Sequence, residues 1–369
     1  MGGTVRLLLG GDVMTGRGID QLLARPVRPR LTERHVVDAR DYVALAERRS
    51  GPIPRPVPPE YPWGDVLELI AEVPTAVRLM NLETSVTHSE ERERHKTVLY
   101  RMSPDNLAVL EVAGVDVWGL ANNHVLDHGR TGLLDTVDAL GSAGLTTAGA
   151  GATEAAAWAP AAVAVQGGAH RVVTLCIAHP SSGVPRHWRA RPSRPGVALV
   201  EGLGRSAADR VTDRLAATSG AGDVRVVSIH WGTNWGHDVP EEQRTFARRL
   251  LAGGVHVVVG HSSHHPRPVE VVDGGLVLYG CGDLVNDYEG IRGYEQFRGE
   301  LRVVYLAALD ATTGHLLDLE IVPFRSRRLR LERADVNDTR WLAGTLAAAC
   351  RAHGTRVEPA GDRLRVPGE

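Results

Sequence analysis

The stretch that decides the fold is Val5-Arg6-Leu7-Leu8-Leu9-Gly10-Gly11-Asp12-Val13-Met14, an apolar run of strand length that leads into an aspartate. Four later apolar runs are also followed at once by amide, acidic or imidazole side chains. In chain order these are Asn81-Leu82-Glu83, Asn122-Asn123-His124, His230, and Gly260-His261-Ser262-Ser263-His264-His265. Ligands of α/β sheets bind at the carboxyl ends of the strands. We therefore expect these five groups to meet in one crevice.

Apolar runs of strand length alternate with amphipathic stretches of helix length, which is typical of an α/β fold. The predicted strands are 5–9, 76–80, 115–120, 172–177, 224–229, 255–259, 269–272, 276–279, 301–309 and 317–322. The predicted helices are 65–72, 105–113, 131–143, 207–217 and 240–252. After Gly254 the chain is rich in strands and carries the hairpin signal Asp273-Gly274-Gly275. This contrast predicts two packed sheets, one mostly parallel and one more antiparallel.

We expect one catalytic domain over residues 1–333 and a C-terminal appendage over 334–369, formed by a helix at 339–349 and a final strand. Two segments dense in Arg and Pro interrupt the alternation, at 25–62 and at 180–195. Long loops inside compact domains are commonly functional. These two segments are predicted to form a rim or lid, with a flexible linker as the alternative for the first.

Composition excludes several classes of protein. The 369 residues carry a formal net charge of −2, which gives no positive field for nucleic acid. No run approaches the roughly 18 apolar residues that span a bilayer, and the N-terminus leads straight into a strand without a signal-peptide pattern. A cytoplasmic location without membrane contact is therefore predicted. Three scattered cysteines (Cys176, Cys281, Cys350) suit neither a disulfide framework nor a thiolate zinc site.

The strand-end side chains favour a metal centre. Carboxylate, amide and imidazole ligands without thiolate suit divalent Mn, Fe or Zn. A carboxylate with imidazoles on both sides can bridge two ions about 3.5–4 Å apart. Each motif alone has a plainer interpretation, since a strand-end histidine is commonly structural and Asn-Asn-His is commonly a turn. The occurrence of five such groups in order, each at the same end of a strand, favours the metal.

The same motifs resemble those of the CapA family, which is similar to the calcineurin-like metallophosphoesterases. They are Gly11–Met14, Asn81–Glu83, Ala121–His124 with Asp127 and Gly129, His230-Trp231-Gly232 and Gly260-His261. Arg17, Tyr61–Asp65, Tyr100-Arg101 and Leu278–Gly290 also resemble a soluble branch of that family. The resemblance covers essentially the whole chain. It implies a four-layer α/β/β/α sandwich of two mixed sheets.

Position by position, the resemblance implies a set of ligands and a proton donor. It makes Asp12 and His264 ligands of a first ion, Glu83 the bridge, and Asn123, His230 and His261 ligands of a second ion. His124 would protonate a leaving group, with Asp127 holding it in orientation. Three departures bear on the ions: Met14 stands where the pattern has His, Glu83 replaces Asp, and His265 competes with His264. One ion is therefore an alternative to two.

A second set of residues is predicted to bind substrate: Arg17, Lys96, Arg101 and Trp231. Lys96 is the only lysine, and arginine forks suit carboxylate or phosphate oxygens. Trp231 and Trp235 flank the loop after His230 and are predicted to wall a pocket, with Asp283 at its mouth. The alternatives are surface charge for the arginines and core packing for the tryptophans.

The resulting hypothesis is a metal-dependent hydrolase that acts on a phosphate ester or an amide or γ-glutamyl-type bond of an anionic small or oligomeric substrate. Two other hypotheses stay open at this stage. One is an accessory or anionic-polymer binding protein of poly-γ-glutamate biosynthesis, to which the resemblance points. The other is a catalyst of small-molecule biosynthesis with a carboxylated substrate. The sequence does not specify the oligomeric state.

Overall fold

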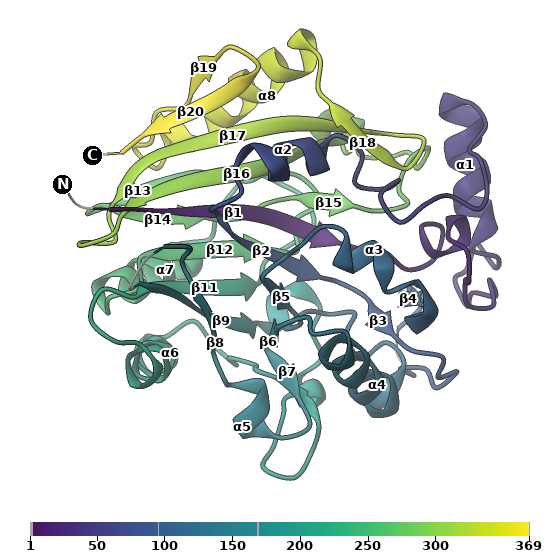
Figure 1. The fold of residues 1–369 in the computed structure, drawn as a ribbon, viewed down its shortest axis with the longest axis horizontal. Coiled ribbons are helices and arrows are strands. Elements are labelled where there is room, and N and C mark those ends of the chain that lie inside the picture. The colour runs from purple at the N-terminus through teal and green to yellow at the C-terminus, as the bar shows by residue number, and fades with distance from the viewer. Residues whose placement is uncertain (1–2, 95, 168–169, 369) are drawn as a thin grey trace.

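A computed structural model describes residues 3–94, 96–167 and 170–368 and shows two mixed sheets with helices around them (Figure 1). The larger sheet has ten strands, with β19-β20-β17-β16-β1-β2-β5-β6 as its main order, β15 beside β1 and β18 beside β17. Its strands are β1 (Thr4–Val13), β2 (Val77–Leu82), β5 (Val117–Gly119), β6 (Thr147–Ala148), β15 (Asp283–Val285), β16 (Leu301–Asp310), β17 (Leu316–Arg327), β18 (Arg330–Arg333), β19 (Glu358–Ala360) and β20 (Arg363–Pro367).

The smaller sheet has six strands in the order β13-β14-β12-β11-β9-β8. They are β8 (Ala161–Ala164), β9 (Arg171–Ala178), β11 (Val224–His230), β12 (Val257–His261), β13 (Val269–Val272) and β14 (Gly275–Leu278). Two short pairs lie apart, formed by β3 (Ser85–Val86) with β4 (Arg101–Met102) and by β7 (Ala150–Gly151) with β10 (Gly196–Val197). The α-helices are α1 (Arg40–Ser50), α2 (Val66–Glu72), α3 (Ala108–Glu111), α4 (Gly129–Ser142), α5 (Glu154–Ala157), α6 (Arg205–Thr218), α7 (Glu241–Ala252) and α8 (Val336–Arg351).

The strands of the smaller sheet are apolar on both faces, as expected when both faces are covered. Val227 and Val258 point to one face, where they pack with Phe246 of α7 and Val211 of α6. Their neighbours in sequence belong to the other face and join the core shared with the larger sheet. The smaller sheet is therefore sandwiched between α6 and α7 on one side and the larger sheet on the other.

The far face of the larger sheet is covered by α2 and α3, which lie in front of its strands in Figure 1. Met80 of β2 and Trp118 of β5 are register partners, so they share this face. Trp118 packs against Trp63, whose indole N–H donates to the carbonyl of Val109 in α3 at 2.6 Å. The predicted four-layer arrangement of two mixed sheets between helices is confirmed.

Both sheets direct the ends of their parallel strands to one region. In the larger sheet β1, β2 and β5 run parallel and adjacent, and in the smaller sheet β11 and β12 do the same. β1 contacts β12, which brings the two sets of strand ends together. Gly11 permits a close approach here, since a Cβ at this position would lie 1.7 Å from the carbonyl oxygen of Gly282. The end of β1 therefore packs closely against the segment that leads into β15.

The prediction of one continuous helix over 105–113 is wrong. The structure has a 3-10 turn at Pro104–Asn106 followed by the short α3. The side chain of Asn106 donates to Asp20 at 2.8 Å and accepts from the backbone of Arg25 at 3.0 Å. These tertiary hydrogen bonds hold the first turn in a conformation that the helical pattern did not predict.

The two Arg/Pro-rich segments and the C-terminal segment have defined places. Segment 25–62 carries α1, and segment 180–195 carries 3-10 turns at Pro180–Ser182 and Arg186–Trp188. At the C-terminal end, α8 contacts β17 and β20 of the larger sheet and β13 of the smaller one. Among the helices described, none combines the length and the apolar character needed to cross a bilayer.

Candidate metal centre

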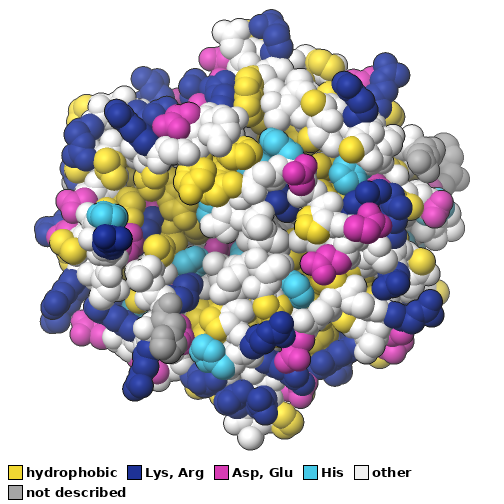
Figure 2. Space-filling model, turned by 180° about the vertical axis from the view of Figure 1, so that it is seen from behind, with side chains coloured by type: hydrophobic (Ala, Val, Ile, Leu, Met, Phe, Trp, Pro, Cys, Tyr) yellow, Lys and Arg dark blue, Asp and Glu magenta, His cyan; other side chains and the backbone are white. Residues whose placement is uncertain are grey.

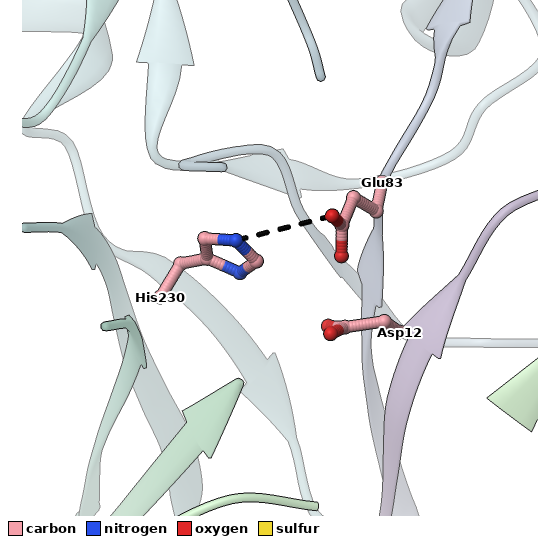
Figure 3. A group of neighbouring side chains, drawn as sticks. All are labelled: Asp12, Glu83 and His230. Atoms are coloured by element: carbon pink, nitrogen blue, oxygen red, sulfur yellow. Dashed lines mark ion pairs between the residues drawn. The ribbon is translucent and has the colours of Figure 1, made fainter. Parts of the chain in front are cut away.

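Three ionisable side chains from three strand ends meet between the two sheets. Asp12 comes from β1, Glu83 directly follows β2, and His230 ends β11. Each offers a ligand atom that lies within 4.8 Å of the others, and the three point toward one another in Figure 3. All three are buried, with exposed fractions of 2% or less. The prediction placed all three in one centre.

Asp12 is held by contacts from both sheets. Its Oδ1 accepts from the side-chain amide of Asn81 at 2.7 Å, and its Oδ2 accepts from the backbone of Ser262 at 3.0 Å. Burial alone would raise the pKa of Asp12, but the nearby His261, whose Nδ1 lies 3.4 Å from Asp12 Oδ1, and the charge of His230 together hold that pKa below its usual value. The Asp12 side chain is therefore ionised and held in a fixed position at this centre.

Glu83 has the opposite electrostatic character. Burial, and then the negative charge of Asp12, raise the pKa of Glu83 well above its usual value. Its Oε1 lies 3.9 Å from His230 Nε2 and 3.7 Å from His124 Nε2. Two neighbouring buried carboxylates repel each other unless a cation lies between them.

The predicted ligands of the second ion lie around His230. The Nε2 atom of His230 is 3.1 Å from the side-chain oxygen of Asn123. His261 is the register partner of His230 in the neighbouring strand β12. Its Nδ1 lies 3.4 Å from Asp12 Oδ1, and its Nε2 lies 2.9 Å from the hydroxyl of Ser228. Asn123, His230 and His261 thus border the same space as the carboxylates.

The adjacent histidines His264 and His265 lie in different environments. His264 Nδ1 contacts Asp283 Oδ1 at 2.9 Å, and its Nε2 is 3.1 Å from the amide of Asn234. Metal-binding histidines commonly bond a carboxylate with their second nitrogen. Both ring nitrogens of His265 bond backbone groups, the carbonyl of Pro266 and the N–H of Gly236. His265 therefore has a structural place, while His264, which bonds the carboxylate of Asp283, stays the predicted ligand.

His124 stands beside the centre, oriented by charged partners. Its Nδ1 lies 2.6 Å from Asp127 Oδ2, and since a carboxylate only accepts, the proton sits on Nδ1. Asp127 Oδ2 also accepts from the backbone of Tyr100 at 2.7 Å. Burial lowers the pKa of His124 to about 4, although the charge of Asp127 opposes this. Its Nε2 is therefore an open acceptor that faces Glu83.

Lys96 belongs to the same arrangement. Its ammonium donates to Asp127 Oδ1 at 2.6 Å and to the backbone carbonyl of Asn123, and it lies 3.2 Å from His124 Nδ1. These contacts occupy the ammonium, which was predicted to bind substrate. We infer that Lys96 positions the His124–Asp127 pair and the Asn123 backbone.

Lys96→Met should lower turnover by roughly 10- to 100-fold, the range found when outer-shell partners are removed, while metal content stays near that of the unmodified protein. Lys96→Arg is the matched control because it keeps the charge beside Asp127. Steady-state kinetics and metal analysis of both variants check this. A Lys96→Met protein that keeps full turnover would contradict a positioning role.

The centre meets the requirements of a divalent ion. Among the described residues, three of its buried atoms have no hydrogen-bond partner: Glu83 Oε2, His230 Nδ1 and His261 Nδ1. Buried polar atoms without partners are rare and costly. A carboxylate and imidazoles without thiolate suit Mn, Fe or Zn. The residues present therefore fit a divalent metal.

Arg17 occupies a place different from the predicted one. It is buried, and its guanidinium donates to both carboxylate oxygens of Asp287, at 3.1 Å from Nε to Oδ2. A further donation goes to Glu33 at 2.8 Å, and the guanidinium lies over the ring of Tyr42. These contacts compensate its charge and tie segment 25–62 to the end of β1. Arg17 therefore has a structural role, connecting these segments, in place of the predicted substrate contact.

Arg17→Met should destabilise the fold by about 3 kcal/mol, because removing one partner leaves a buried charge uncompensated. The free energy of unfolding from urea titration measures this, and Arg340→Met on α8, which removes one exposed arginine, is the control. The double variant Arg17→Met with Asp287→Asn should lose less than the sum of the single losses. Strict additivity would contradict the pairing.

Two further predicted substrate residues are placed as follows. Arg101, in β4, is 9% exposed and donates to the carbonyl of Ser89 at 2.7 Å. Trp231 lies in the core under α7, beside Phe246, and its indole N–H donates to the carbonyl of Tyr279 at 3.1 Å. Core packing, the alternative interpretation, describes Trp231. Its burial replaces the predicted substrate contact.

Some residues of the site were not predicted as such. Asn81 bonds Asp12, and Asn122 donates to Asn81 Oδ1 and to the carbonyl of Leu82. Asp283 was expected only at the mouth, yet it bonds His264. The asparagines stand inside the quoted motifs, so their position in the sequence was the available signal. Asp283 follows a glycine-rich turn after β14, and this position is a weaker sequence signal.

Comparison with known proteins agrees with these motifs. The family described as bacterial capsule synthesis protein PGA_cap matches residues 6–288, a span that includes every proposed ligand. The chain belongs to the PGA_cap family. A relative, the probable polyglutamine synthesis accessory protein of Mycobacterium tuberculosis, is 48% identical over 361 residues, which is 98% of this chain and 95% of that protein.

A more distant relative is the PGA biosynthesis protein CapA of Bacillus subtilis, 26% identical over 226 residues, or 61% of this chain and 56% of that protein. The resemblance to the CapA family is thus confirmed. Among solved structures, a 5'-nucleotidase precursor from Thermus thermophilus aligns with a TM-score of 0.45 and 19% identity, covering 87% of this chain and 54% of the other.

Proposed function

We propose that this PGA_cap protein is a metal-dependent hydrolase of an anionic substrate. The observation that carries the proposal is the set of atoms on Glu83, His230 and His261 that have no partner within the described part of the chain, next to an oriented His124. His124 Nε2 lies 3.7 Å from Glu83 Oε1, so a proton-transfer group stands at the edge of the ligand set. A site built only to hold an ion would not need that group.

The ion or ions would be held by residues from both sheets. Asp12, Glu83 and His264 would hold the first ion, and Glu83, Asn123, His230 and His261 the second. When bound, divalent ions such as Mn, Fe or Zn supply an activated water and stabilise developing negative charge. Met14 stands where the family pattern would place another imidazole, so the second of these two sites has the fuller protein ligand set.

His124 would move the proton of the reaction at Nε2. Asp127 holds the Nδ1 proton and fixes the ring, which leaves the Nε2 lone pair directed at the centre. An anionic group of the substrate beside the ring would stabilise the imidazolium and favour later donation to the leaving group. The buried position excludes bulk water from this exchange.

The bond cleaved belongs to one of two classes, a phosphate ester or an amide of γ-glutamyl type. The names of the relatives, polyglutamine synthesis and PGA biosynthesis, favour the γ-glutamyl class. A small carboxylated metabolite would present the same chemistry as a polymer end. The substrate in all cases carries negative charge.

A second candidate is an accessory protein that binds an anionic polymer without cleaving it. It is favoured by the name of the Mycobacterium tuberculosis relative, an accessory protein. It would need the fold and a binding surface, but not the buried Asp127–His124–Lys96 arrangement. That arrangement is why the hydrolase is preferred.

The decisive experiment is metal analysis of protein purified without chelator, followed by turnover assays on phosphate esters, peptides and γ-glutamyl amides with Mn, Fe and Zn. We expect one or two ions per chain and hydrolysis in one anionic class. Protein that binds γ-glutamyl oligomers but hydrolyses no substrate would support the accessory function instead.

A further inference from the structure

A cavity of about 270 Å³ opens beside the candidate metal centre. His264 and Asp283 form its inner side, and Arg302 of β16 lines it together with Trp235 and Tyr294. The face of the molecule shown in Figure 2 is hollowed, with hydrophobic, histidine and acidic side chains around the hollow. The volume is close to the lower end of known ligand pockets, ~300 Å³.

Arg302 is the unusual side chain of this cavity. It is 2% exposed, and all its hydrogen bonds go to neutral oxygens. These are the carbonyls of Gly299 and Leu301 and the side-chain oxygen of Asn286, while its Nε has no partner among the described residues. A buried charge is costly without an opposite charge in contact. Burial lowers the pKa of Arg302, although the charge of Asp283 opposes this.

The carboxylates that share the cavity already have donors. Asp283 accepts from Asn286 at 2.6 Å and bonds His264, and Glu300 accepts from Arg298 at 2.9 Å. Glu289 accepts from the hydroxyl of Ser50 and from the backbone of Leu329. Glu295 accepts from the backbone of Gly293. These contacts leave the Arg302 guanidinium without direct ionic compensation from the described chain.

Part of the cavity lining is an aromatic wall. Trp235 and Tyr294 stack with ring centroids 4.1 Å apart and planes at 5°. Trp235 also lies 5.3 Å from the ring of His264, so this wall runs from the metal centre outward. Exposed Ile291 borders the same space. The wall suits the apolar part of a ligand whose charged end lies at Arg302.

We propose that this cavity binds the carboxylate of the substrate, with Arg302 as its anion ligand and the Trp235–Tyr294 wall against its carbon skeleton. A carboxylate is favoured over a phosphate because one guanidinium balances one negative charge. His264, a predicted ligand of the centre, lines the cavity, so the rest of the substrate would extend toward the centre. This inference rests on the proposed function for the identity of the ligand as substrate.

The test is calorimetric titration of chelator-treated protein with phenylacetate, with phenylacetamide and phenyl phosphate as comparison probes. We expect phenylacetate to bind and both comparison probes to bind at least 10-fold more weakly. Arg302→Gln should weaken phenylacetate binding by about 10- to 100-fold, as for a lost charge-assisted hydrogen bond. Arg340→Gln, which removes an exposed arginine of α8, should leave binding unchanged.

A second variant covers the case in which Arg302→Gln does not fold. Ile291 is 44% exposed, so Ile291→Trp adds bulk to the cavity without removing a buried contact. It should abolish phenylacetate binding and keep the melting temperature. No binding to the unmodified protein, equal binding of amide and carboxylate, or unchanged binding in both variants would overturn the subsite.

The outcome separates this inference from the proposed function. The titration uses metal-free protein and needs no turnover, so it reports the subsite alone. Metal content and hydrolysis are measured on separate samples. If the protein binds carboxylate through Arg302 but has no hydrolytic activity, the subsite is supported and the hydrolase proposal is contradicted. If the protein is a hydrolase but binds no carboxylate through Arg302, the hydrolase proposal is supported and the subsite is contradicted.

Discussion

Replacing His230 and His261 together by alanine is expected to remove nearly all divalent metal from the purified protein. The two imidazoles are register partners on adjacent strands and border the same space as Asp12 and Glu83. Loss of a single outer-shell partner already costs 10- to 100-fold in affinity, so loss of two ligands should lower occupancy below about a tenth. Elemental analysis by mass spectrometry after purification without chelator gives the measurement.

The neighbouring histidines provide matched controls for this variant. His265→Ala should keep its metal because both ring nitrogens bond backbone groups. His264→Ala should lose part of the metal, since its contact with Asp283 is that of an oriented ligand. Full metal content in the double variant would show that the ligand assignment is mistaken. Metal loss in His265→Ala alone would reverse the choice between the two adjacent histidines.

The sequence contained enough information to predict the centre of the fold. The apolar run at 5–9 and the run before His230 form strands because both faces of their sheets are covered, which continuous apolar runs signal. Asp12 and His230 then had to converge once two parallel sets of strand ends were packed together. The convergence of Asp12, Glu83 and His230 in the structure follows from this rule.

The partners of the charged side chains could not be predicted from the same rule. Arg17 meets Asp287, 270 residues away, through β15 beside β1, and no local pattern encodes that pairing. Trp231 follows His230 directly, but the alternation of faces in β11 sends its ring to the α7 side. Lys96 was noticed as the lone lysine, yet its partner Asp127 depends on the packing of two loops.

The environment of Arg302 also could not be predicted from the sequence. In the sequence Arg302 stands in the predicted strand 301–309, and it was not among the predicted site residues. In the structure it is buried in the lining of the cavity and bonded to neutral oxygens. Burial of a charge without a contacting counter-charge is a property of the assembled fold. It becomes visible only when the neighbours of the guanidinium are known.

The last expected result concerns proton transfer. His124→Ala should lower turnover by roughly 10²- to 10⁴-fold, the usual contribution of general acid–base assistance. Metal content should stay near that of the unmodified protein, because His124 Nε2 lies 3.7 Å from Glu83 Oε1 and its Nδ1 belongs to Asp127. Asp127→Asn should be similarly impaired, since an amide can donate to Nδ1 and so favour the opposite tautomer.

Exposed His88, on the loop after β3, is the matched control, and His88→Ala should keep both metal and turnover. Turnover numbers measured at saturating metal, with metal content determined on the same samples, distinguish the two roles open to His124. A proton-transfer group loses rate and keeps metal, whereas a ligand loses both in proportion. Proportional loss of metal and rate in His124→Ala would therefore assign His124 to the ligand set and leave the proton to be moved by another group.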